Sequence, residues 1–224
     1  MSAYFTADLF RFLGELEKHN NREWFLANKE RYEKSVRDPF LQLVKDLGPR
    51  LAKLSAHIVA DPKPVGGSMM RIHRDIRFSK DKRPYKDHLD MSFRNGGSKG
   101  APGYWFRLTP TRLVLGAGMH MLDKPDLERF RMAVDARGSG EALDREVTKL
   151  EKSGYDLGGE HYKRVPAGFP PDHPREALLR HNGVYAGTEM KLPAEARTAR
   201  FPAFCAGHYK KLAPLMDWLS TNVA

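Results

Sequence analysis

The segments LDMSF (residues 89–93) and YWFRL (residues 104–108) decide the fold, because each places an apolar side chain at every second position. The same period of two begins earlier, over residues 70–78, and an apolar run follows at residues 113–115. A period of two is typical of a strand whose faces meet different surroundings. The short stretches between these segments favour antiparallel neighbours over parallel strands joined by helices. We therefore predict an antiparallel meander over roughly residues 69–120.

Helical periodicity flanks this meander on both sides. Apolar residues three and four positions apart recur through residues 6–54, 125–154 and 201–219. The proline- and glycine-rich residues 155–175 are predicted to form an ordered loop. Helices, then an antiparallel sheet, then helices are typical of an α+β fold, here a central antiparallel sheet packed by N- and C-terminal helices. We find no linker long enough to separate two domains, so residues 1–224 are predicted to form a single α+β domain.

The net charge and the cysteine content limit which kinds of partner and which kinds of site the chain can have. The 224 residues include 38 Lys or Arg and 28 Asp or Glu, a formal net charge of +10. Such an excess favours an anionic partner, for example a phosphorylated small molecule or a nucleic acid. Cys205 is the only cysteine, which excludes an intramolecular disulfide and a cysteine-based zinc site. No apolar run approaches the roughly 20 residues that span a bilayer, and the first twenty residues are too charged for a secretion signal. We therefore expect a cytoplasmic protein without a membrane partner.

The segment of residues 71–88, RIHRDIRFSKDKRPYKDH, carries the clearest functional signal, because seven Lys or Arg and three Asp fall within it. On a strand over residues 70–78, alternation places four polar side chains on one face: Arg71, His73, Asp75 and Arg77. Paired guanidinium groups suit a phosphate or a carboxylate, which each group can bind through two parallel hydrogen bonds.

We therefore predict a binding or catalytic site for a phosphorylated or otherwise anionic small molecule, centred on residues 71–88. The candidate acid or base is His73 or Asp75, because a group that titrates near neutrality is required there. The candidate anion-binding residues are Arg71, Arg74, Arg77, Lys80, Lys82, Arg83, Tyr85 and Lys86. No dinucleotide fingerprint, Walker loop, zinc-protease motif or EF-hand occurs. The sequence therefore assigns no cofactor, and whether the site catalyses a reaction is left open.

Two other interpretations of this segment stay open. The basic residues would also suit a nucleic-acid-binding module without chemistry. Alternatively the segment is structural, with Asp75 paired to Arg74 or Arg77 and the lysines solvated. His73, Asp75 and His88 are side chains of the types that bind metal ions. The surrounding cations would repel a divalent metal ion, so no metal ligand is predicted.

Four stretches of the chain resemble one family. The run RDIRFSKDKRPYK (residues 74–86) resembles the signature of the domain-of-unknown-function family numbered 2461, and so does NNREWF (residues 20–25). Further similarity is found in PAGF (166–169) with DHP (172–174), and in PLMDWL (214–219). The resemblance spans nearly the whole chain. It implies one domain and favours a functional role for residues 74–86, and it implies no particular activity or cofactor.

Overall fold

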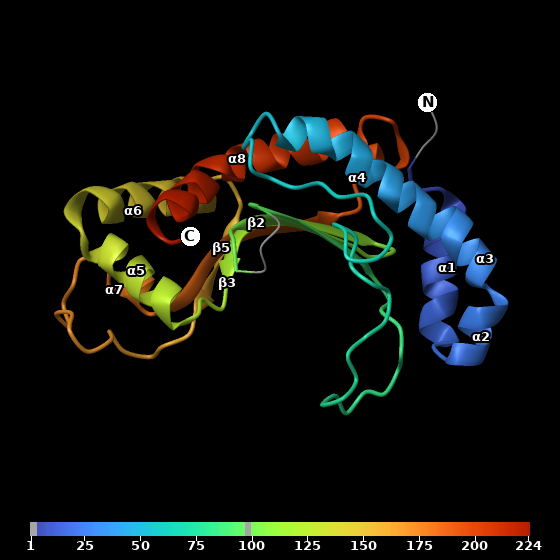
Figure 1. The fold of residues 1–224 in the computed structure, drawn as a ribbon, viewed down its shortest axis with the longest axis horizontal. Coiled ribbons are helices and arrows are strands. Elements are labelled where there is room, and N and C mark those ends of the chain that lie inside the picture. Colours follow the sequence, from blue (N-terminus) through green and yellow to red (C-terminus); the bar gives the residue numbers. More distant parts are fainter. Residues whose placement is uncertain (1–3, 97–99) are drawn as a thin grey trace. The chain divides into compact units, whose positions relative to one another are not determined.

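The computed structural model describes residues 4–96 and 100–224 of the chain (Figure 1). In chain order the elements are α1 (Ala7–Lys18), α2 (Arg22–Ala27), α3 (Lys29–Tyr32), the π-helical η1 (Glu33–Arg37), α4 (Asp38–Leu51), β1 (Leu89–Arg94), β2 (Gly103–Leu108), β3 (Arg112–His120), α5 (Lys124–Asp135), α6 (Arg137–Lys152), β4 (Asp156–Glu160), α7 (Glu176–Leu179), β5 (His181–Lys191), the 3-10 helix η2 (Ala194–Arg197) and α8 (Phe201–Asn222). None of the helices in the described ranges is both long enough and apolar enough to cross a membrane.

The strands form an open antiparallel sheet in the order β1-β2-β3-β5-β4. The first three neighbours follow one another in the chain, as the period of two over residues 89–115 predicts. β5 lies beside β3, and β4 pairs antiparallel with β5, with Asp156 opposite Gly187. Helices precede and follow the strands, so the predicted α+β class is confirmed.

Residues 70–78, predicted as a strand, do not form one. The local pairing that matters for the site is an isolated bridge between His73 and Tyr85. The carboxylates of Asp75 and Asp81 each accept a hydrogen bond from the backbone N–H two residues further on, at 3.2 and 3.0 Å. Such turns give the backbone an alternative to a strand ladder, so the alternation of apolar residues is not sufficient here.

Two strands lie beyond the predicted meander. β4 falls within residues 155–175, which the sequence predicts as a loop, and its sequence DLGGE has no apolar alternation. At Gly159 the φ angle is +111°, and a Cβ atom would lie 2.0 Å from the backbone oxygen of Gly183, so only glycine fits at this point of the pairing. The pattern of apolar residues does not predict β4, because its pairing with β5 depends on how closely the two backbones can approach and not on alternating side chains.

The chain divides into two compact units, each formed by three segments. Unit 1 comprises Met1–Phe93, Trp105–Val114 and Glu189–Gly207, and unit 2 comprises Arg94–Tyr104, Leu115–Thr188 and His208–Ala224. The single domain expected for residues 1–224 therefore stays a prediction.

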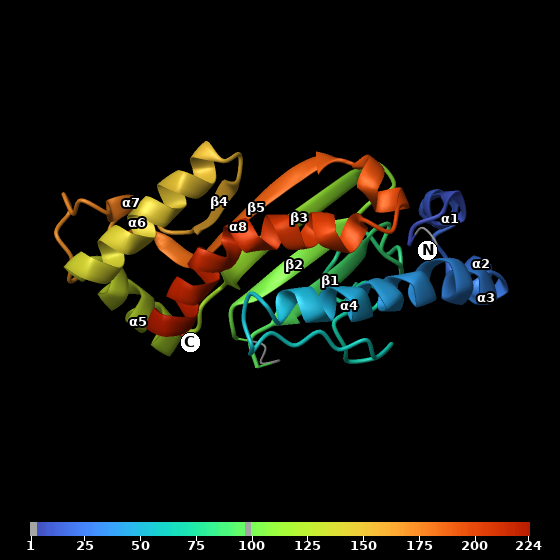
Figure 2. The same cartoon turned by 90° about the horizontal axis from the view of Figure 1, so that it is seen from above.

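Unit 1 has an aromatic core. Phe5 lies 5.4 Å from Phe201 and 5.8 Å from Phe40, measured between ring centroids. Phe40, in α4, in turn meets Phe106 of β2 at 5.6 Å, and all four rings are buried. Figure 2 shows α4 running along the strands β1 and β2. These ring contacts hold the helix on that face of the sheet, because tilted and edge-to-face aromatic pairs add to the stabilisation from buried area.

Unit 2 has a core of its own. Its helices α5 and α6 lie side by side in both Figure 1 and Figure 2. Phe130 of α5 packs edge to face against Trp218, with 6.0 Å between ring centroids. The indole N–H of Trp218 donates to the carbonyl of Ser139 at 2.8 Å, so this buried donor is satisfied.

Candidate functional site

The basic segment of residues 71–88 belongs to unit 1, where it forms a long loop that runs out from the strands and back (Figure 1). In this loop Asp75 and Arg77 form a bidentate ion pair, with Nε to Oδ1 at 3.0 Å and Nη2 to Oδ2 at 2.7 Å. The hydrogen bonds from Arg77 lower the pKa of Asp75 to about 2. A carboxylate with a lowered pKa that is held in an ion pair is a weaker base than a free one, and the role of Asp75 as acid or base stays a prediction.

Asp81 neutralises two further cations of the segment. It accepts hydrogen bonds from Nε of Arg83 at 2.9 Å and from Nη1 of Arg74 at 2.7 Å. These bonds, first those from Arg83, hold the pKa of Asp81 well below its usual range. Both arginines, which the sequence predicts to bind an external anion, therefore already bind a carboxylate of the protein.

Asp90 in β1 is a buried carboxylate that sequence reasoning missed. Its Oδ2 accepts from Nζ of Lys86 at 2.8 Å and lies 3.3 Å from Nε2 of His88, and its Oδ1 accepts from Nε of Arg107 at 2.8 Å. Burial alone would raise the pKa of Asp90, but the hydrogen bonds from His88, Arg107 and Lys86 outweigh it and hold the pKa well below its usual range. The available signal was an acidic residue inside an apolar strand, directly after the basic run.

Four of the seven cations predicted to bind an anion thus have carboxylate partners: Arg74, Arg77, Arg83 and Lys86. Arg71, Lys80 and Lys82 form no ion pair with any residue that the structure describes, and Lys82 donates instead to the carbonyl of Ile76 at 3.1 Å. The structural interpretation therefore accounts for more than half of the charge of the segment. We therefore expect an anion to bind at cations that have no acidic partner, because those cations lose no ion pair when they bind it.

A cavity of about 430 Å³ in unit 1 adjoins this loop. We name it the α2 pocket, because α2 and the start of α3 line one side of it. The other side is lined by the segments of the basic loop that the His73–Tyr85 bridge joins. The lining residues are Arg22, Phe25, Leu26, Lys29, His73, Pro84 and Tyr85. A cavity of this volume accommodates a small-molecule ligand.

The side chain of Asn20 fixes the position of Tyr85 in the pocket. Its Oδ1 accepts from the backbone N–H of Tyr85 at 2.9 Å, and its Nδ2 donates to the Tyr85 carbonyl at 3.0 Å. On its other edge, the chain around Tyr85 is bridged to the chain around His73 by two backbone hydrogen bonds of 2.8 Å. The amide of Asn20 therefore takes the place of a neighbouring strand, and the backbone of this buried residue is fully hydrogen-bonded.

Two stacked rings form the apolar wall of the α2 pocket. Phe25 and Tyr85 lie 4.2 Å apart between ring centroids, with 18° between their planes, and both residues are buried. The exposed ring of His73 lies 5.1 Å from Tyr85 and 6.1 Å from Phe25. A planar group that enters the pocket would therefore meet aromatic carbon beside one titratable nitrogen base.

Arg22 and Lys29 supply the positive charge of the pocket. Both side chains are exposed, and neither forms an ion pair within the described part of the chain. Burial raises the pKa of Tyr85 and the nearby charge of Arg22 opposes this only in part, so the phenol is a hydrogen-bond donor at neutral pH.

Sequence reasoning did not single out Arg22 or Lys29 as site residues. The signal that could have found the first is the segment NNREWF at residues 20–25, which carries part of the family resemblance. Its first residue, Asn20, binds Tyr85 of the second motif, so the two motifs meet at this pocket.

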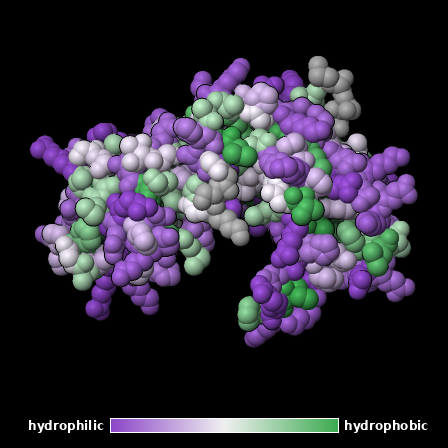
Figure 3. Space-filling model, in the orientation of Figure 1, coloured by the Kyte–Doolittle hydropathy of each residue, from purple (hydrophilic) through white to green (hydrophobic). Residues whose placement is uncertain are grey.

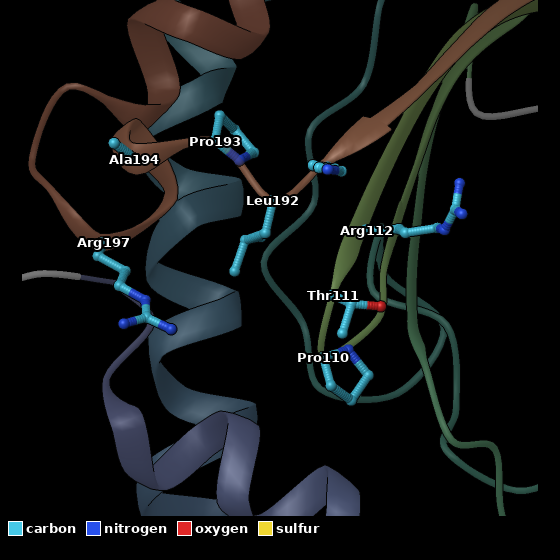
Figure 4. Close-up of a pocket in the computed structure, with 8 residues that line it drawn as sticks. Pro110, Thr111, Arg112, Leu192, Pro193, Ala194 and Arg197 are labelled. Carbon is cyan, nitrogen blue, oxygen red and sulfur yellow. The ribbon is translucent and has the colours of Figure 1, made fainter.

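A larger cavity of about 690 Å³, also in unit 1, is a weaker candidate (Figure 4). Its lining includes three cations, but Arg112 is paired with Glu189 at 2.6 Å and points away from Leu192 in Figure 4. The guanidinium of Arg197 lies over the ring of Phe10, 5.2 Å from its centroid. With neither a histidine nor an aromatic side chain in its lining, this cavity offers less to a ligand than the α2 pocket.

The histidines weighed as metal ligands belong to different clusters. His73 lies against Tyr85, whereas His88 contacts Asp87 at 2.7 Å and Asp90 at 3.3 Å. Within residues 4–96 and 100–224, no group of three or more His, Cys, Asp or Glu side chains has an arrangement that could hold a metal ion.

The fold and the pocket define an α+β protein whose antiparallel sheet carries a basic loop beside a cation-lined aromatic cavity. The model of the conserved hypothetical protein family DUF2461 matches residues 8–218, so the chain belongs to this family, as the resemblance of residues 74–86 implies. In a comparison with curated proteins, none matches the chain.

Proposed function

We propose that the protein binds an anionic small molecule with a planar apolar portion in the α2 pocket. The observation that supports this most strongly is the pairing of two cations, Arg22 and Lys29, with a wall of stacked rings. A cation without an acidic partner loses no internal ion pair when it binds an external anion, whereas the guanidinium of Arg77 must first leave Asp75. The sequence predicts the anion site on the outer part of the basic loop. The proposal places it instead in the α2 pocket, where the two ends of that loop meet α2.

The lining residues divide the recognition between them. Arg22 and Lys29 suit a phosphate or carboxylate, and the apolar wall that Phe25 and Tyr85 form suits a ring or another flat group. His73 lines the pocket and Asp75 does not, so any acid–base chemistry in the pocket would pass through His73. A reduced, buried Cys205 and the composition fit the cytoplasmic location proposed for the protein.

The test is a calorimetric titration with phenyl phosphate and with inorganic phosphate. We expect phenyl phosphate to bind more tightly, because its ring can contact the aromatic wall. Arg22→Gln and Lys29→Gln should each weaken phenyl phosphate binding about tenfold or more, because each removes a charge-assisted hydrogen bond. Arg77→Gln is the matched control: it removes the same unit of charge from the loop but no contact in the pocket, and should leave the dissociation constant unchanged.

Two results would overturn this proposal. If Arg77→Gln weakens binding and Arg22→Gln does not, the anion lies on the outer loop, as the sequence alone suggests. If both phosphates bind equally, the aromatic wall plays no part in recognition.

A further inference from the structure

Phe78 is almost completely exposed, at the outer part of the basic loop. Its relative exposure is 95%, higher than that of any other large apolar residue in the described ranges. The guanidinium of Arg77 lies 5.8 Å from its ring centroid, so the ring has a cation on one side and solvent elsewhere. In Figure 3 the projecting part of the surface is mostly hydrophilic, with hydrophobic atoms among the charged groups. Because single exposed rings are common on protein surfaces, the charges that surround Phe78 decide whether it marks a binding site.

The loop that carries this ring is held by its own ion pairs. Asp75 binds both the side chain and the backbone N–H of Arg77, and Asp81 does the same for Arg83. The exposed Lys82 adds a hydrogen bond within the loop to the carbonyl of Ile76, and its ammonium keeps further donors for an anion. These local contacts shape the loop so that the ring of Phe78 is left facing solvent.

The charge around Phe78 selects an anionic partner. Lys80 and Lys82 are exposed within four residues of the ring, and Arg71 lies at the start of the loop. None of the three has an acidic partner within ion-pair distance among the described residues. The net charge of +10 on the whole chain adds a long-range attraction of the same sign.

We propose that the loop of residues 74–84 binds single-stranded nucleic acid, with an unpaired base stacked on Phe78 and the adjoining phosphates neutralised by Lys80 and Lys82. A single exposed ring is enough to stack one base, and stacking on aromatic side chains with cations along the backbone is how single strands are held. A membrane surface is less well matched. Phe78 has polar neighbours in Arg77 and Ser79, and no second exposed large apolar side chain accompanies it in the loop.

The ring and the two lysines proposed to contact the nucleic acid are separate from the α2 pocket, since of residues 74–84 only Pro84 lines that cavity. The two proposals can therefore fail independently. Phe78→Ala should leave phenyl phosphate binding unchanged, and saturating phenyl phosphate should not displace an oligonucleotide.

The experiment is fluorescence anisotropy with a labelled 12-residue oligothymidine at 50 mM salt. We expect Phe78→Ala to weaken binding about 5- to 150-fold, the range that loss of one stacked base produces, and Phe78→Trp to retain affinity. Lys80→Gln with Lys82→Gln should lower the slope of log affinity against log salt by about 1.4, since each phosphate contact to a single strand contributes about 0.7. Phe78 packs against no core residue, so folding of its variants is not at risk.

The outcomes separate the alternatives. Equal affinity of Phe78→Ala and wild type, or tighter binding of a matched duplex than of the single strand, would overturn the stacking proposal. Loss of binding to phosphatidylserine vesicles in Phe78→Ala, with no oligonucleotide binding by the wild type, would assign the loop to a membrane surface instead.

Discussion

Replacing Asn20 by alanine is expected to destabilise the protein by about 2–4 kcal/mol, because two backbone groups of a buried residue lose their partners at once. The side chain of Asn20 satisfies both the N–H and the carbonyl of Tyr85, at 2.9 and 3.0 Å, and Tyr85 is only 4% exposed. Alanine offers neither a donor nor an acceptor, and the opposite edge of this segment is already bonded to the chain around His73. The backbone of Tyr85 would therefore be left without partners in a partly dry site.

Urea unfolding followed by circular dichroism measures this loss as a lower midpoint at an unchanged slope. Asn21→Ala is the matched control at the neighbouring position. Its side chain accepts from the N–H of Trp24 at 2.9 Å and caps α2, so its removal should cost only about 1 kcal/mol. If Asn20→Ala is no worse than Asn21→Ala, the amide of Asn20 does not hold Tyr85. If it is worse, phenyl phosphate binding should weaken in parallel, because the aromatic wall of the pocket loses its anchor.

The sequence predicts β1, β2 and β3 but neither β4 nor β5, for a physical reason. Residues 89–93 and 104–108 alternate because each strand has one face in an apolar core. β4, with the sequence DLGGE, has no such alternation, and its pairing depends on the close approach of the backbone at Gly159 to the backbone at Gly183. This approach joins two positions that are 24 residues apart in the chain, so no local sequence pattern predicts it.

Charge density identifies the region of the site, while the partners of the charges depend on the fold. Residues 71–88 do adjoin the α2 pocket, and His73 and Tyr85 from the predicted set line it. The sequence suggests that Asp75 pairs with Arg74 or Arg77. Arg77 forms that pair, and Arg74 pairs with Asp81 instead. It does not suggest that Asp90 holds Lys86 together with Arg107, because Arg107 comes from the next strand of the sheet. Local pairs can be predicted from the chain, and pairs across the sheet require its register.

Replacing Asp90 by asparagine is expected to cost about 3–5 kcal/mol, the range found when one partner of a buried ion pair is removed. The carboxylate is 9% exposed and binds Lys86, Arg107 and His88 through its two oxygens. Asparagine keeps the shape but removes the negative charge, so three positively charged or donor groups are left around a neutral amide. Lys86, with a side chain only 20% exposed, cannot move fully into water without disturbing its neighbours.

The same carboxylate links stability to pH. The pKa of Asp90 in the folded protein lies below its usual value of about 4, so the ionised form stabilises the fold above that pH. This contribution is complete at neutral pH and is lost as the pH falls below about 4 towards the folded pKa. Melting temperatures recorded from pH 7 to pH 2.5 should therefore fall less steeply with pH in Asp90→Asn than in the wild type.

Asp75→Asn is the control for both measurements. Its ion pair with Arg77 is exposed, with side chains 45% and 75% accessible, and pairs of this kind contribute little to stability. We expect its melting temperature at pH 7 to match that of the wild type. A loss in Asp75→Asn as large as that in Asp90→Asn would mean that the outer loop, and not the cluster at β1, is the structural centre of the basic segment. The loop would then be too tightly coupled to the fold to serve as an independent binding element.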